Sequence, residues 1–237
     1  MIIRHQGTTP FLITQPDHAN LAATIMHKWQ ANGLPDSPRR AAILLAVKEH
    51  DNGWHEVDAQ PIVDTESSEI LDFMHLPDDE RRGVWPRGVQ RLADTPYSAA
   101  LVAQHAVHIY RRYRDDAAWV PFFSEMEGLR DRYLRQAHDA TLDELLSDYL
   151  FLRIGDLASL TFCNGWADAP DETGHAVRFD GKRLTISPDP FGGETLSIAV
   201  SARQLTATRF DSAASAAAAF ANAPTVTLSG SVNGSSR

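Results

Sequence analysis

The sequence predicts a mainly α-helical fold, a helical bundle that carries a small C-terminal extension of antiparallel β structure. Apolar side chains recur at helical spacing over residues 14–165, and from residue 176 the pattern changes to short segments that alternate as strands do. The 237 residues, 43% of them hydrophobic, are enough to bury one sizeable core. We therefore expect a helical domain over residues 1–168, a β-rich extension packed on it over 169–229, and a disordered tail over 230–237.

Each predicted helix has a recognisable start. The start signals are Thr14 with Pro16, Ser37 with Pro38, Thr95 with Pro96, and the capping box from Thr141 to Glu144. Gly33 and Gly53 end the first two helices, and a further helix is expected over 119–137. Residues 55–77 contain two prolines and no clean period, so we expect a long loop there, and Pro86 should break the helix that follows.

The C-terminal extension is predicted from alternation and turn signals. Strands are expected at 176–179, 183–186, 195–200, 206–209 and 225–228, with an Ala-rich helix at 212–221. Asp180-Gly181 is a hairpin turn signal between the first two strands. The exposed edges of so short a sheet favour a homodimer.

Composition narrows the classes of partner and of site. The formal net charge of −9 argues against nucleic acid or an anionic membrane as the main partner, so a small-molecule substrate is expected. No apolar run approaches the roughly 18–20 residues of a membrane span. The first residues lack the apolar core of a signal peptide, so we expect a cytoplasmic protein. The single cysteine, Cys163, excludes an internal disulfide and a Cys-rich zinc site.

The candidate site centres on the pair His50-Asp51, which ends an apolar helical stretch. A histidine and a carboxylate are costly to bury unless something holds them, and a metal ion commonly does so. His18, His105 and Asp156 lie on the apolar faces of three other predicted helices, so packing of the bundle should bring all five side chains together. Nitrogen and oxygen ligands without thiolate suit Fe, Mn, Mg, Zn, Co or Ni, as one ion or two. Taken singly, each residue also fits a core hydrogen bond or a helix cap.

Four segments of the chain carry a family resemblance. They are Gln15–Ala22, Glu49–Trp54, Pro96–His105 and Gly155–Leu160. They resemble the family called domain of unknown function 3891, over most of the chain including its β-rich part, and that family brings no known activity with it. A looser resemblance rests on the order of residues along the chain: a histidine, then a His-Asp pair, then an aspartate, each on a separate helix. This order resembles that of the HD-domain superfamily of metal-dependent phosphohydrolases.

The HD resemblance implies a role for each ligand-type residue. The ligands of a first ion would be His18, His50, Asp51 and Asp156. HD proteins with two ions add two histidines between the His-Asp pair and the last aspartate, and His105 and His75 match these positions. His108, one turn beyond His105, is an alternative to it.

These observations predict a metal-dependent hydrolase of HD type that acts on a small-molecule phosphoester. Asp51 is expected to bind the metal and to orient the attacking water, and His105 to bind a second ion or to act as a general acid or base. A two-iron oxygenase of HD type is one alternative, and it requires both His75 and His105 as ligands. A non-catalytic metal- or ligand-binding protein is the other.

The substrate pocket is expected to draw on residues close to the ligands in the sequence. Its candidate members are Lys48, Trp54, Trp85 and Arg153. Trp54 directly follows the His-Asp pair, and Lys48 and Arg153 are cations suited to a phosphate. A further three arginines, Arg81, Arg82 and Arg87, occupy a segment that could roof the site.

Overall fold

The computed structural model of the chain describes residues 1–138, 140–169 and 173–236. Its helices are α1 (Gln15–His27), α2 (Arg40–Glu49), α3 (His55–Ala59), α4 (Asp78–Gln90), α5 (Pro96–Ile109), α6 (Val120–Gln136), α7 (Leu142–Asn164) and α8 (Ala213–Asn222), with short 3-10 turns η1 (Asn52–Trp54) and η2 (Arg111–Tyr113). Its strands are β1 (Ile2–Gln6), β2 (Thr9–Ile13), β3 (Asp168–Ala169), β4 (Ala176–Phe179), β5 (Arg183–Ser187), β6 (Thr195–Gln204) and β7 (Thr225–Gly234).

The expectation of a mainly α-helical bundle with a small β extension is wrong. The chain is 48% helix and 19% strand, and the described strands form one seven-stranded mixed sheet, which makes the fold α+β. The strand order is β1-β2-β6-β7-β5-β4-β3, and β5 and β7 run parallel while the other neighbouring pairs are antiparallel. The extension was expected to be antiparallel and C-terminal, whereas its sheet includes two N-terminal strands.

The N-terminal strands were missed because they lack a clean alternation. In β2, four consecutive residues from Pro10 to Ile13 are buried, so the strand has no polar face to mark its period. β2 pairs with β6 through Phe11 and Leu12, which meet Gln204 and Arg203. The two paired strands lie on opposite sides of the boundary expected at residue 168. The formation of β2 as part of the sheet therefore depends on residues far away in the sequence.

Several C-terminal elements also differ from expectation. β6 and β7 are each ten residues long, and β7 runs to Gly234 through the start of the tail that was expected to be disordered. This part of the tail is ordered because β7 pairs with β6 on one side and with β5 on the other, so its backbone groups have hydrogen-bond partners on both sides. No strand forms at 206–209 in the described chain beyond an isolated bridge between Arg209 and Glu69.

Two helical segments were likewise predicted incompletely. α4 continues through Pro86 as one helix of 13 residues instead of breaking there, and the expected loop over 55–77 begins with α3. The capped helices were predicted well. Thr14 caps α1 by accepting from the N–H of Asp17, and the capping box of Thr141 and Glu144 begins α7.

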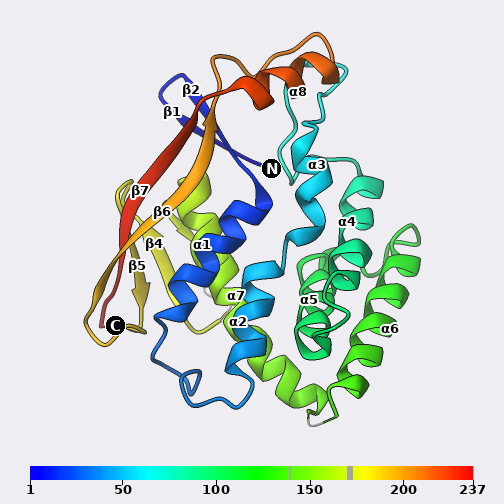
Figure 1. Cartoon of the computed structure of the whole chain (residues 1–237), viewed down its shortest axis with the longest axis vertical. Helices are drawn as coiled ribbons and strands as arrows, with labels where there is room; N and C mark the ends of the chain where they lie inside the picture. The colour runs from blue at the N-terminus through cyan, green and yellow to red at the C-terminus, as the bar shows by residue number, and fades with distance from the viewer. Residues whose placement is uncertain (139, 170–172, 237) are drawn as a thin grey trace.

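Helices α1 and α7 lie between the sheet and helices α2, α4, α5 and α6 (Figure 1). α1 packs on β6, and α7 packs on β1 and β4, while α2 and α5 contact α7 from the other side. A continuous apolar core links the two halves, from Ile2 in β1 through Ile25 in α1 to Val232 in β7. Helices α1 and α7 are therefore held in place by contacts on both of their sides. Both helices carry residues of the candidate site.

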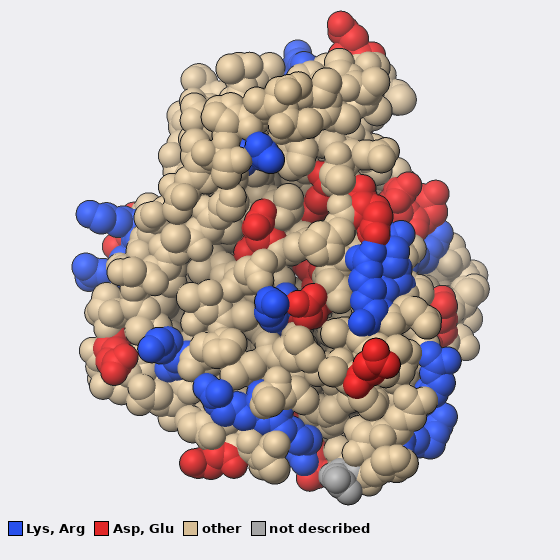
Figure 2. All heavy atoms as spheres, in the orientation of Figure 1, with Lys and Arg blue, Asp and Glu red and all other residues tan. Residues whose placement is uncertain are grey.

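The surface carries charges of both signs close together. On the face drawn in Figure 2, lysine and arginine side chains lie next to aspartate and glutamate side chains, so the net charge of −9 is not gathered into one acidic area of that face. Within the residues that the structure describes, no helix has both the length and the apolar character needed to cross a bilayer.

Candidate metal centre

Four helices bring five ligand-type side chains to one point inside the protein. His18 comes from α1, the pair His50-Asp51 from the end of α2, His105 from α5 and Asp156 from α7. They form two overlapping groups, one of His18, His50 and Asp51 and one of His50, His105 and Asp156, and in each group the ligand atoms all lie within 4.8 Å of one another. The three imidazoles are 0–2% exposed, so the cluster is sealed from bulk water except near Asp156.

His50 presents an unused nitrogen to the middle of the cluster. It caps the C-terminus of α2, and its Nδ1–H donates to the carbonyl of Val47 at 2.7 Å. Its Nε2 is buried and has no hydrogen-bond partner among the described residues, while Asp156 Oδ1 lies 3.4 Å away and Asp51 Oδ2 3.6 Å away. A backbone acceptor on one ring nitrogen is how metal-binding histidines are usually oriented. An orphaned, pre-oriented nitrogen beside two carboxylates fits a cation.

His18 is oriented in a similar way by a side chain. Its Nδ1 lies 2.9 Å from the hydroxyl of Ser159, which itself donates to the backbone carbonyl of Asp156 at 2.9 Å. Because the hydroxyl hydrogen is committed to that carbonyl, the serine oxygen accepts from His18 Nδ1–H. Nε2 of His18 therefore faces the carboxylate of Asp51 at 2.7 Å.

The two aspartates remain ionised inside the protein. Burial opposes their ionisation, but His50 and its neighbouring histidines outweigh burial, lowering the pKa of Asp51 and bringing the pKa of Asp156 to about 2. Burial also opposes protonation of His50, yet Asp51 and Asp156 raise its pKa to about 9. The site thus attracts positive charge strongly, which a divalent cation bound between its imidazoles and carboxylates would satisfy.

His105 differs from the other two histidines in its surroundings. Burial lowers its pKa to about 4, so the ring is neutral near pH 7. Its Nδ1 lies 3.1 Å from the hydroxyl of Tyr149, and its Nε2 lies 3.7 Å from Asp156 Oδ2. The hydroxyl of Tyr149 is protonated, since burial and the charge of Asp156 raise its pKa well above the usual range. Tyr149 and Ser159 were not predicted as supporting residues, although their spacing from Asp156 on α7 places them on its face.

Some predicted site residues lie outside the cluster. The His75 side chain is 69% exposed, and its Nδ1 pairs with Asp72 Oδ1 at 2.6 Å. The ring of His108 packs against Tyr149 at 5.4 Å between centroids, and neither group of ligand atoms includes it. Lys48 is half exposed and pairs with Glu49 at 3.4 Å.

A cavity of about 580 Å³ borders the cluster. Asp51, His105 and Asp156 form part of its wall, and Trp54 and Trp85 lie there as the sequence suggests. Lys48 and Arg153 are not among the described residues that line it. The remaining lining residues are Gln15, Phe73, Met74, His75, Arg81, Ile109, Tyr110, Arg112, Leu160 and Trp166. Several of these come from loops and from turns beyond helix ends, where periodicity gives no signal.

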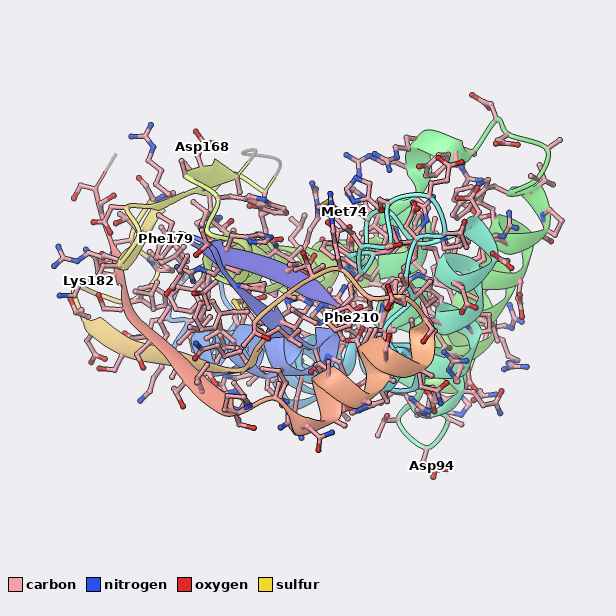
Figure 3. All side chains as sticks on the ribbon, turned by 90° about the horizontal axis from the view of Figure 1, so that it is seen from above. Met74, Asp94, Asp168, Phe179, Lys182 and Phe210 are labelled. Atoms are coloured by element: carbon pink, nitrogen blue, oxygen red, sulfur yellow. The ribbon has the colours of Figure 1, made fainter. Side chains whose placement is uncertain are left out.

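The open side of this cavity is the loop that carries Met74 and His75. Both side chains are exposed, at 42% and 69%, and both line the cavity. In the view from above, Met74 lies on the side of Phe179 and Lys182 that faces the helices of the other half (Figure 3). The exposed side chains of the cavity wall therefore include two from the loop before α4.

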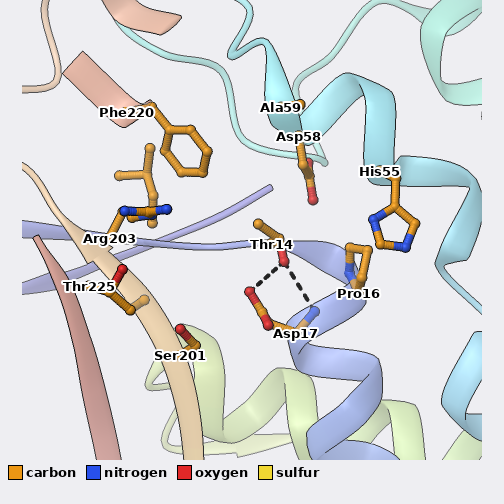
Figure 4. A pocket seen from close by; sticks show the side chains of 12 residues that line it. Thr14, Pro16, Asp17, His55, Asp58, Ala59, Ser201, Arg203, Phe220 and Thr225 are labelled. Carbon is orange, nitrogen blue, oxygen red and sulfur yellow. Dashed lines mark hydrogen bonds between the residues drawn. The ribbon is translucent and has the colours of Figure 1, made fainter. Parts of the chain in front are cut away.

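A smaller cavity of about 250 Å³ lies at the N-terminus of α1 (Figure 4). Three of its polar side chains have structural partners. The hydroxyl of Thr14 donates to Asp17 Oδ2 at 2.6 Å and accepts from the Asp17 N–H at 3.1 Å, and Arg203 donates to the carbonyl of Ala223 at 2.9 Å. The metal-type cluster borders the larger cavity instead.

The fold and the cluster together define an α+β protein with a buried His/Asp site of metal-ligand type beside a cavity. The chain belongs to the family described as "Protein of unknown function (DUF3891)", whose model matches residues 1–207, so that resemblance is confirmed. No curated protein and no solved structure matched the chain.

Proposed function

We propose that this protein is a metal-dependent hydrolase and that its substrate is a small-molecule phosphoester. The observation that carries the proposal is the pair of overlapping His/Asp groups, joined by the orphaned Nε2 of His50 and open to a cavity of about 580 Å³. A cluster that only stabilised the helices would not need a cavity at its edge. The proposed likeness to HD proteins concerns only four residues, His18, His50, Asp51 and Asp156. It does not extend to the fold, because this chain contains a seven-stranded sheet.

The residues divide between holding a cation and moving a proton. A bound divalent cation supplies Lewis acidity towards a phosphoryl oxygen and makes water easier to deprotonate. The residues that would hold it are His18, His50, Asp51 and Asp156. Hydrogen bonds to Val47 and Ser159 fix the ring orientations of His50 and His18. His105 is neutral near pH 7 and borders the cavity, so it is suited to accept the proton of the attacking water.

Two alternative functions are less well supported. A two-iron oxygenase would need His75 as a ligand, and this side chain is paired with Asp72 at the cavity opening. A non-catalytic binding protein agrees with the cluster but leaves the adjoining cavity unexplained. No observation in the described chain favours either alternative over hydrolysis.

The first experiment measures metal content and turnover in aspartate variants. Purified protein is loaded with Mn, Fe, Zn or Co, desalted, and analysed by elemental analysis and with a panel of phosphomonoesters and phosphodiesters. We expect Asp51→Asn and Asp156→Asn to lose both metal and turnover. Asp148→Asn is the matched control, since Asp148 is a buried carboxylate on the same helix α7 that binds Arg39 and Tyr97 instead. It should keep both.

Two outcomes would contradict the proposal. Stoichiometric metal in Asp51→Asn would show that the cluster is not the metal site. A fully loaded wild-type protein that hydrolyses no phosphoester of the panel would show that the site has another role.

A further inference from the structure

We propose that the cavity selects phosphoesters with a flat apolar body, and that Arg81 is the specificity residue that binds their anionic group. This inference rests on the proposed function for the position of the reacting group, and it deepens that function by naming the substrate class. Aryl phosphomonoesters have this combination of a compact anion and a planar apolar part.

The cavity wall is mostly aromatic and apolar. The aromatic lining residues are Trp54, Phe73, Trp85, Tyr110 and Trp166, and the aliphatic ones are Met74, Ile109 and Leu160. Aromatic walls favour a flat apolar partner through stacked and edge contacts. The carboxylates and His105 lie in the same wall, so one end of a bound molecule meets the cluster while its body contacts the rings.

Arg81 is a fixed and nearly dehydrated cation in this wall. It is 9% exposed, and its guanidinium lies 5.6 Å from the ring centroid of Tyr113 and 5.7 Å from that of Trp119. Asp78 binds its Nη2 and also accepts from Trp119 Nε1 at 3.1 Å, which holds the side chain in place. Its buried Nε has no partner among the residues described. A planar guanidinium with an unused donor suits a phosphoryl group.

The charge balance of the site also calls for such a cation. Two carboxylates, Asp51 and Asp156, offset the charge of one divalent cation, so the cluster by itself offers an anion little net attraction. Arg81 provides the additional positive charge, and Asp78 offsets it only in part because its side chain is 45% exposed to water.

The test uses two ligands that cannot be hydrolysed and differ only in their body, phenylphosphonate and methylphosphonate. Titration calorimetry with metal-loaded wild-type protein should show phenylphosphonate binding about tenfold more tightly or better, from burial of the ring. Arg81→Gln should weaken phenylphosphonate binding about tenfold or more without changing metal content. Arg82→Gln is the matched control, because Arg82 is adjacent on α4, contacts Trp119 and is not in the lining. Its affinity should equal that of the wild type.

Several results would overturn the inference. They are equal affinity for the two phosphonates, no binding of either one, or unchanged phenylphosphonate affinity in Arg81→Gln. If Arg81→Gln does not fold, Arg81→Lys provides the same test, since lysine keeps the charge but loses the planar fork and should also bind more weakly. Tight, Arg81-dependent phosphonate binding without any turnover would defeat the proposed hydrolysis alone, whereas turnover that is independent of Arg81 would defeat this inference alone.

Discussion

At the scale of single residues, hydrogen bonds to the outer ring nitrogens decide what the cluster can bind. Val47 and Ser159 take the Nδ1–H of His50 and His18, and this leaves both Nε2 atoms directed at the two carboxylates. Neither residue would be noticed as functional in the sequence, because one acts through its backbone and the other is a buried serine.

The supporting role of Ser159 gives a first prediction. Ser159→Ala removes the acceptor of His18 Nδ1–H, so we expect metal affinity to fall about 10- to 100-fold while the protein stays folded. Competition with a chelator measures the change. Ser98→Ala is the control, because Ser98 is also fully buried and donates to a backbone carbonyl, that of Ala42, at 2.8 Å. Equal metal affinity in the two variants would argue against the role of Ser159.

His50 gives a second prediction, on pH and stability. Its folded pKa of about 9 lies above its ordinary value of 6.5, so the folded state binds a proton that the unfolded state loses first. The stabilisation is complete below pH 6.5 and disappears as the pH rises through 9. We expect the unfolding temperature of the chelator-treated protein to fall over this range. His50→Gln should reduce that fall, and substitution of the exposed His55 by Gln should leave it unchanged.

At the scale of elements, the close approach of η1 to α4 positions the ligand pair. An added Cβ at Gly53 would lie 2.0 Å from the backbone oxygen of Val84 and 3.0 Å from the nitrogen of Gly88. Arg87 and Arg91 also donate to the carbonyls of Gly53 and Asn52. The turn that follows Asp51 is therefore held against α4 by backbone contact, which requires glycine.

The glycines of this contact give a third prediction. Gly53→Ala should destabilise the protein by about 3 kcal/mol, because the helix backbone has to move to admit the methyl group. Gly83→Ala on the facing helix should instead stabilise it by up to about 1 kcal/mol, since nothing lies within 4 Å of the added Cβ and alanine favours helix. Urea unfolding of both variants measures the difference. Similar stabilities would show that the contact is looser than described.

At the scale of the whole molecule, the sheet and the helices share one core. Leu184 in β5 and Phe162 in α7 are both buried in the cluster that also contains Trp54 and Trp85. The domain boundary expected at residue 168 stays a prediction, and the homodimer does too. The shared core leads us to expect that the two halves unfold together.

Leu184→Ala tests this cooperativity and is the fourth prediction. Loss of a fully buried leucine should cost about 2–5 kcal/mol. Three of the five tryptophans report on the helical part by fluorescence, since Trp54 lies in η1, Trp85 in α4 and Trp119 directly before α6. If the molecule unfolds as one unit, this fluorescence transition should move to lower urea together with the circular dichroism transition. An unchanged tryptophan transition would mean that the sheet unfolds by itself.

The sequence by itself determined the capped helices and the clustering of five ligand-type side chains. His18, His50, His105 and Asp156 were identifiable because helical periodicity places each on an apolar face, where a polar side chain is costly. It also indicated the family, since the quoted motifs are local.

Only the tertiary structure decided the sheet and the cavity. β1 pairs with β2, and β2 joins the sheet by pairing with β6, some 190 residues away. No local pattern encodes that second pairing. His75 was predicted as a ligand from its order in the chain, but the path of the 55–77 loop places it with Asp72 at the cavity opening. Arg81 lies in the first turn of α4 and lines the cavity where this helix packs on α5. Packing between segments far apart in the sequence sets the positions of these strands and side chains. The free energy of that packing outweighs the local preference of each segment for helix, strand or loop.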